Sequence, residues 1–215
     1  MLALQLRRDG TSVMLRDQRL RQWSTLIQEH EEDISKIMTL ESGKPLSESR
    51  GEVAYGRSFV DYFAGEATRP GGAGGGSIIP STLSMDDGRP KGQMMTINQA
   101  VGCTAMVTPW NFPLAMITRK ASPALAAGCT VIVKPSELTP LTALVSQELA
   151  YRAGIPEDVF QIITSDQKTT PSVGKELCSN PTISKISFTG STAEGKLLME
   201  WSSPCVKRLS LELGG

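Results

Sequence analysis

Two short segments place polar side chains where they can take part in chemistry. Asn111 lies between two prolines in TPWNFP, and its amide can donate a hydrogen bond to a developing oxyanion. Lys134 and Glu137 follow the apolar run CTVIV, and an ammonium and a carboxylate at this spacing can hold the two hydroxyls of a ribose. The plainer interpretations are a turn asparagine that bonds its own backbone and a surface ion pair of little energetic value.

Two later segments combine an apolar run with glycine. In FTGST, Gly190 lets a ligand approach the backbone, Ser191 offers a hydroxyl, and the next helix N-terminus can bind an anion. In LSLELGG, Glu212 interrupts an apolar strand, where burial is expected to raise its pKa and suit it to act as a general base. The plainer alternatives are an ordinary helix N-cap and a glutamate turned to solvent.

The stretch ISFTGSTAEGKL also resembles a phosphate-binding P-loop, because Gly190 is followed by Gly195 and Lys196. A P-loop needs a hydroxyl for Mg²⁺ next, and Leu197 has none. We therefore expect a solvated Lys196 and a core-facing Leu197, and we disfavour an NTPase. The glycines near residue 72 do not complete a dinucleotide fingerprint, since its last position is Ser77 and no helix follows.

The elements that must position these residues change character near residue 100. Residues 1–68 are predicted to be a helical segment, with apolar residues near a 3.6-residue period at Leu20, Trp23, Ile27, Ile34, Ile37 and Met38. Gly43 and Pro45 indicate a helix stop. Residues 69–100 are predicted to be a Gly-rich connection with oligomerisation-type strands, one of them at Ser77–Pro80.

Beyond residue 92, short β-rich runs alternate with helical segments. The runs are MMTI, CTAMVTP, CTVIVKP, VFQIIT, ISKISFTG and VKRLSLELGG. This alternation predicts an α/β fold with a doubly wound parallel sheet covered on both faces. The segment PLTALVSQELAYRAG is predicted to be a helix that Thr139 caps, Pro140 begins and Gly154 ends. Ligands of such sheets bind at the carboxyl ends of the strands.

Composition excludes several classes of protein. Lys+Arg and Asp+Glu both number 22, so no polyanion or nucleic-acid partner is indicated, and no apolar run can span a bilayer. The four cysteines form no CxxC pair and His30 is the single histidine, so we expect no metal site and no Ser-His-Asp triad. The cysteines favour a reduced compartment. We expect a cytoplasmic location, with mitochondria as the alternative, although Asp9 and Asp17 weaken a transit-peptide interpretation of the N-terminal arginines.

In order along the chain, TPWNFP, AAGCTVIVKPSELTP, KISFTGS and LELGG resemble the signatures of the NAD(P)-dependent aldehyde dehydrogenases. ESGKP, GEV and FAGEA in the helical half resemble the same superfamily, and the resemblance covers residues from about 15 to 215. AMITRKASPALAAGCTVIVKP and SKISFTGST resemble the succinate-semialdehyde dehydrogenases of GABA catabolism in particular.

The resemblance implies a role for each candidate residue. Residues 101–215 would be part of an NAD(P)-binding domain, Asn111 the oxyanion donor and Glu212 the base that activates the deacylating water. Arg119 would meet a substrate carboxylate, unless it is a helix-surface arginine. The residues expected at NAD or NADP are Thr108, Pro109, Trp110, Lys134, Ser136, Glu137, Gly190, Ser191, Gly195 and Leu213.

The family nucleophile is a cysteine that lies a few dozen residues beyond the position of Glu212. We therefore expect a fragment that lacks the catalytic domain and is inactive alone, cut from an enzyme that oxidises succinate semialdehyde or a related small aldehyde and forms a homo-oligomer. The alternative is a non-catalytic short protein that binds NAD(P) or a partner.

Overall fold

A computed structural model describes residues 11–214, and a five-stranded parallel sheet lies at its centre. The strands are β3 (Cys103–Val107), β4 (Thr130–Lys134), β5 (Phe160–Ile162), β6 (Ile183–Ser191) and β7 (Arg208–Gly214). Their order in the sheet is β5-β4-β3-β6-β7, and every neighbouring pair is parallel. The predicted α/β fold is confirmed.

The strand order reverses beside β3. From β3 the chain builds β4 and β5 on one side, and it then returns to place β6 and β7 on the other side. The carboxyl ends of β3 and β6 therefore flank a topological switch point, where ligands of doubly wound sheets bind. Asn111 lies in the segment that follows β3, and Gly190 is one of the last two residues of β6.

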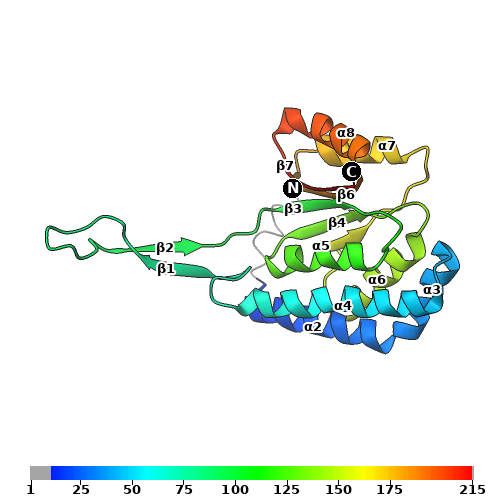
Figure 1. Cartoon of the computed structure of the whole chain (residues 1–215), viewed down its shortest axis with the longest axis horizontal. Coiled ribbons are helices and arrows are strands. Elements are labelled where there is room, and N and C mark those ends of the chain that lie inside the picture. Colours follow the sequence, from blue (N-terminus) through cyan, green and yellow to red (C-terminus); the bar gives the residue numbers. More distant parts are fainter. Residues whose placement is uncertain (1–10, 215) are drawn as a thin grey trace.

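Helices cover both faces of the sheet (Figure 1). On one face lie α5 (Ala115–Ala126) and α6 (Pro140–Arg152), and on the other lie α7 (Thr170–Ser179), α8 (Thr192–Ser202) and the 3₁₀ turn η1 (Ser203–Cys205). The N-terminal helices α2 (Val13–Glu29), α3 (Glu31–Ser42) and α4 (Leu46–Thr68) form a further layer outside α5 and α6.

The N-terminal helices share one apolar core with the sheet. Of the six periodic apolar positions, Ile37 is half-buried and the other five are buried: Leu20, Trp23, Ile27, Ile34 and Met38. The indole N–H of Trp23 donates to the Ser146 carbonyl at 3.1 Å, and its ring centroid lies 5.5 Å from that of Phe160. Within the described part of this segment, helices occupy most of residues 13–68, with breaks at His30 and at the Gly43–Pro45 turn.

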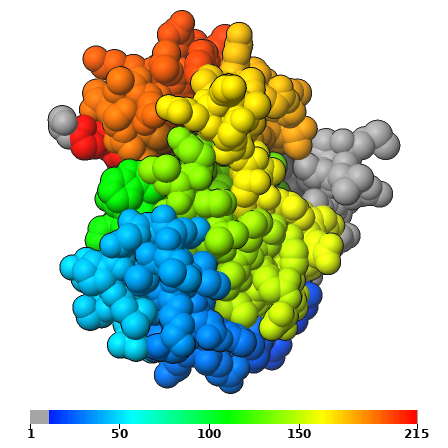
Figure 2. Space-filling model, turned by 90° about the vertical axis from the view of Figure 1, so that its right-hand side faces the viewer, coloured from blue at the N-terminus to red at the C-terminus, as the bar shows by residue number. Residues whose placement is uncertain are grey.

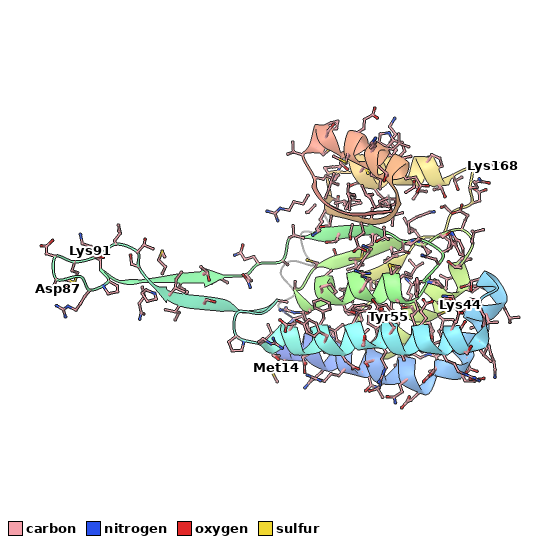
Figure 3. All side chains as sticks on the ribbon, viewed as in Figure 1. Met14, Lys44, Tyr55, Asp87, Lys91 and Lys168 are labelled. Carbon is pink, nitrogen blue, oxygen red and sulfur yellow. The ribbon has the colours of Figure 1, made fainter. Side chains whose placement is uncertain are left out.

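Residues 76–97 form a hairpin that projects away from the rest of the chain (Figure 1). Its strands β1 (Gly76–Pro80) and β2 (Gln93–Ile97) pair antiparallel, and Figure 3 labels Asp87 and Lys91 at its tip. We expected MMTI among the runs of the parallel sheet, and this was wrong. β1 pairs with it instead, and the exposed apolar side chains of the hairpin include Ile78, Met95 and Ile97.

The start of α6 differs from the prediction in one respect. Pro140 lies in the first turn and Gly154 follows the helix with a φ of 84°, as expected, but the Thr139 side chain caps nothing. Its hydroxyl is buried and has no hydrogen-bond partner in the described part of the chain. The carboxylate of Glu41 on α3 accepts the Leu141 and Thr142 N–H groups at 2.8 and 2.9 Å instead.

Some expectations are not tested by these residues. Arg7, Arg8 and Asp9, which bear on the transit-peptide question, lie outside the described range. The division into residues 1–68, 69–100 and 101–215 stays a prediction. Within residues 11–214, none of the helices combines the length and the apolar character that crossing a membrane requires.

Candidate active site

The candidate residues gather along the edge where the parallel strands end. Figure 2 faces this edge and shows the yellow-green β4–α6 region between the blue N-terminal helices and the orange α8 region. The Thr108 N–H donates to the Lys134 carbonyl at 3.2 Å, which joins the loops after β3 and β4. The Thr108 hydroxyl is buried and has no partner among residues 11–214.

Lys134 is a buried cation at the end of β4. Its ammonium lies 3.4 Å from the exposed Glu137 carboxylate, its one partner within residues 11–214. An ammonium has three N–H donors, so this geometry leaves donors free for a ligand. Glu137 also lines a shallow hollow with the exposed Leu141 and Leu144 of α6 and with residues 164–167 after β5. Ser136 is half-buried and accepts the Leu138 N–H at 3.3 Å.

Ser191, the last residue of β6, is the N-cap of α8. The Ser191 hydroxyl accepts the Glu194 N–H at 3.2 Å and donates to the Glu194 carboxylate at 3.0 Å. The Phe188 ring and the Glu194 carboxylate fill the space where a Cβ on Gly190 would stand. Packing of the chain itself therefore requires this glycine, and the plainer N-cap interpretation of Ser191 describes the hydrogen bonds observed here.

Helix α8 packs on β7 through its one glycine. A Cβ on Gly195 would lie 2.6 Å from Leu213 Cδ2, so the glycine allows close contact with the end of β7. Leu198 is the buried neighbour on this face. Leu197 is 44 % exposed, so the expectation that it faces the core was wrong. Lys196 is exposed as expected.

Glu212 lies in a cluster of charged residues from α5, β6 and β7. Its carboxylate accepts from Lys120 Nζ at 3.2 Å and from the Thr189 hydroxyl at 3.1 Å, and it lies 3.5 Å from the Arg119 guanidinium. Lys120 also donates to the Ser187 hydroxyl at 3.2 Å. The structure thus brings together Arg119 and Glu212, which are 93 residues apart in the numbering (212 minus 119).

Sequence reasoning missed Lys120. Its side chain is 4 % exposed, and desolvation lowers the pKa of this ammonium although the nearby Glu212 opposes the shift. The signal was a charged Arg-Lys pair within the otherwise apolar helix AMITRKASPALA, where a charge needs a buried partner. A buried ammonium beside a carboxylate can hold and exchange a proton at the strand edge.

The pKa of Glu212 is shifted opposite to the prediction. Partial desolvation by itself raises this pKa, but the charges of Lys120 and Arg119 and the hydrogen bonds from Lys120 and Thr189 outweigh it. The pKa of Glu212 therefore lies below its usual value, and a carboxylate held so is ionised at neutral pH and can act as a base.

We predict that Lys120→Met raises the pKa of Glu212, because it removes the largest of the favourable charge interactions. A carboxyl ¹³C NMR titration checks this, with exposed Lys196→Met as the control. In the wild-type chain the Glu212 interactions stabilise the fold above the unfolded pKa of this carboxyl and are lost as pH falls through the lower folded pKa. An unchanged or lower pKa of Glu212 in Lys120→Met would contradict the assigned cause.

Asn111 lies apart from these clusters. Its side chain is exposed beside Trp110, which is 51 % exposed, and Pro109 is half-buried. The Asn111 carbonyl accepts from Lys44 Nζ at 2.8 Å. The structure therefore places Asn111 at the carboxyl edge, with its backbone held by the α3–α4 turn.

The cysteines and a partly enclosed cavity lie away from this edge. Cys103 and Cys129 stand where β3 and β4 begin, Cys178 ends α7, and Cys205 precedes β7. Burial raises the thiol pKa of Cys103 and of Cys178. A cavity of about 250 Å³ at the same opposite edge includes Arg16 and Cys129. Arg16 there donates to the Ala126 carbonyl at 2.9 Å, so it serves the end of α5.

Comparison with known protein families identifies the class of protein to which this fold belongs. The model of the aldehyde dehydrogenase family matches residues 6–215. The chain belongs to the aldehyde dehydrogenase family.

Within this family, the chain is similar in sequence to succinate-semialdehyde dehydrogenases. The chain is 52 % identical over 196 residues to the mitochondrial succinate-semialdehyde dehydrogenase of Arabidopsis thaliana, covering 91 % of this chain and 35 % of that protein. It is 50 % identical over 196 residues to succinate-semialdehyde dehydrogenase [NADP(+)] of Escherichia coli, covering 91 % of this chain and 38 % of that protein. The chain therefore spans well under half the length of these relatives.

A solved structure supports the fold independently. Betaine aldehyde dehydrogenase from Staphylococcus aureus, a point mutant in complex with NAD⁺, superposes with a TM-score of 0.87 at 31 % identity. The match covers 99 % of this chain and 42 % of that one.

Proposed function

We propose that this chain is the cofactor-binding part of an oxidoreductase that oxidises succinate semialdehyde or a related aldehyde to the acid with NAD or NADP. The observation that carries the proposal is the buried Lys134 ammonium, which keeps donors free beside Glu137 within the described residues, at the carboxyl edge of the sheet and on the strand next to β3. Family membership and the names of the relatives support the reaction class and the semialdehyde substrate.

The residues present fit a nicotinamide dinucleotide. Lys134 and Glu137 supply a donor and an acceptor for the adenosine ribose, and the hollow beside Leu141 and Leu144 suits the adenine. The buried Thr108 hydroxyl has no partner among the described residues and is free to bond a polar ligand. When bound, the nicotinamide accepts the hydride.

For the pyrophosphate we propose the junction of β6 and α8, with Gly190 and Ser191 at the end of the strand and Gly195 in the helix. The N–H groups of a helix N-terminus favour an anion. Glu194 occupies this position in the structure, since its carboxylate accepts from Ser191. Pyrophosphate binding at this turn therefore requires the Glu194 side chain to move away from Ser191. Leu213 near the end of β7, and Pro109 and Trp110 after β3, would also contact the cofactor.

For the chemistry we propose roles for four polar side chains. Asn111 donates to the developing oxyanion, Glu212 takes a proton from the deacylating water, and Lys120 stabilises the Glu212 carboxylate. Arg119 suits a substrate carboxylate because a guanidinium offers a planar, bidentate fork. Its present partner Glu212 is 3.5 Å away, so the substrate would compete with a weak ion pair.

For the assembly we propose a homo-oligomer of the whole protein, with the apolar hairpin as a contact between subunits. The exposed Ile78, Met95 and Ile97 of β1 and β2 lie away from the core of their own chain. For the location we propose the cytoplasm, with mitochondria as the alternative.

We predict that the purified 215-residue chain does not reduce NAD⁺ or NADP⁺ when given succinate semialdehyde. Oxidation of an aldehyde through a thioester needs a cysteine thiolate beside Glu212, at the carboxyl edge of the sheet. The cysteines described above lie at the opposite edge. The absorbance of the reduced cofactor at 340 nm measures this. Turnover above a blank without protein would contradict the prediction.

The position of the cysteines, at the edge of the sheet opposite Glu212, also favours a second candidate function. In this alternative the chain binds the cofactor but does no catalysis. Binding of NAD(P) without turnover supports this alternative for the chain alone. Aggregation of the purified chain instead would indicate an enzyme fragment that needs the rest of its sequence, because exposed apolar strands such as β2 promote association.

A further inference from the structure

The start of α5 depends on a buried carboxylate from another helix. Glu52 on α4 has a side chain 1 % exposed, and its Oε1 accepts the Leu114 and Ala115 N–H groups at 2.9 and 3.2 Å. The N-cap residue Leu114 offers no side-chain acceptor of its own. The first N–H groups of a helix lack intrahelical partners and carry partial positive charge, so a carboxylate there satisfies both needs.

Lys44 connects this carboxylate to the preceding loop. Its ammonium pairs with Glu52 Oε2, donates to the Asn111 carbonyl at 2.8 Å, and lies 4.6 Å from the centroid of the Phe112 ring. The Gly43–Pro45 turn, where Gly43 has a φ of 74°, projects Lys44 toward the carboxyl ends of the strands. Figure 3 labels Lys44 at this end of the molecule.

Together the two side chains hold the backbone of Asn111–Ala115 at both ends. Within residues 11–214 the Trp110 indole and the Asn111 amide have no hydrogen-bond partners, so the backbone must set their direction. We propose that Lys44 and Glu52 are positioning residues that fix the Trp110–Asn111 loop at the carboxyl edge of the sheet. The role of Asn111 as an oxyanion donor rests on the proposed function. The contacts of Lys44 and Glu52 are observed in the structure and do not depend on it.

Glu41 provides an internal comparison. It makes the same kind of contact from the same helical layer, because its carboxylate accepts the first N–H groups of α6 at Leu141 and Thr142. It therefore braces the loop of Lys134 and Glu137, and not that of Asn111. If each carboxylate positions its own loop, replacing one should leave the other loop in place.

NMR of the 215-residue chain tests the proposal without cofactor or aldehyde. We expect Glu52→Gln to speed amide exchange at Leu114 and Ala115 by about tenfold, because the charged acceptor of these two hydrogen bonds becomes a neutral and weaker one. The Trp110 indole and Asn111 amide signals should shift or broaden. Amides of the β4 core should change little. Glu48→Gln on the same helix is the matched control, because Glu48 is exposed and has no partner among the described residues.

Two further variants separate positioning from general stability. Glu41→Gln should affect Leu141 and Thr142 and spare residues 110–115. Lys44→Met leaves Glu52 buried and unpaired and can prevent folding, so the neutral Lys44→Met/Glu52→Gln chain is measured beside it. In that chain we expect the same local changes at Trp110 and Asn111.

Unchanged Trp110 and Asn111 signals in Glu52→Gln and in the double variant would overturn the proposal. Uniformly faster exchange across the whole chain would also overturn it, because that outcome shows only lost stability. Cofactor binding is a separate measurement, so its failure would count against the proposed function and leave this result standing.

Discussion

Trp23→Ala should destabilise the chain by about 3–5 kcal/mol, the usual cost of truncating a buried tryptophan. The Trp23 ring is fully buried, contacts Phe160 and donates its indole N–H to the Ser146 carbonyl. It therefore joins α2 to α6 and to the edge strand β5. The free energy of unfolding in urea, followed by far-UV circular dichroism, measures the loss.

Two other variants show whether the buried ring is the cause. Trp23→Phe keeps an aromatic ring but loses the hydrogen bond, so we expect an intermediate loss that includes about 1 kcal/mol for that bond. Trp110→Ala removes an exposed ring, and surface changes of this kind are usually within about 0.5 kcal/mol. A Trp23→Ala loss as small as that of Trp110→Ala would show that the N-terminal helices are not part of the sheet's core.

Lys134→Met should weaken NAD⁺ binding by about tenfold or more, since hydrogen bonds to a charged group are worth about 1.5–3 kcal/mol. Lys134 is buried at the end of β4 with free donors, whereas methionine fills similar space without any. Isothermal calorimetry measures the dissociation constant. Lys175→Met, at an exposed position on α7, is the control.

Glu137→Gln addresses the choice of cofactor at the same pair. The carboxylate repels the 2′-phosphate of NADP⁺, so removing its charge should raise the affinity for NADP⁺ relative to NAD⁺. An unchanged ratio of the two affinities would place the ribose away from Glu137.

For the Lys134→Met variant, an unchanged NAD⁺ affinity would contradict the proposed function, because that proposal depends on the free donors of Lys134.

Most of the fold could be predicted because local patterns report it. The periods at Leu20, Trp23 and Ile27 indicated the first helix, and short apolar runs between helices indicated the parallel sheet. MMTI was misassigned because a short apolar run does not reveal its pairing partner. Leu197 was misassigned because Gly195 faces the sheet, and this turns Leu198 inward and Leu197 outward.

The sequence suggested candidate site residues, whose roles stay predictions, but it did not reveal their interactions. Glu212, Arg119 and Lys134 were identified from sequence, yet the sign of the Glu212 pKa shift depends on Lys120, a partner from another element. The carboxylate caps from Glu41 and Glu52 join positions 100 and 62 residues apart in sequence. No local pattern encodes such contacts, because they arise only when the helical layer packs on the sheet.

The proposed function requires this chain to bind a nicotinamide dinucleotide at the carboxyl ends of β3, β4 and β6. The most direct test is an NMR titration of the ¹⁵N-labelled chain with NAD⁺ and, separately, NADP⁺. We predict saturable shifts at Thr108, Lys134, Glu137 and residues 190–195. Shifts confined to the cavity at Arg16 and Cys129, or no saturable shifts with either cofactor, would contradict the proposed function.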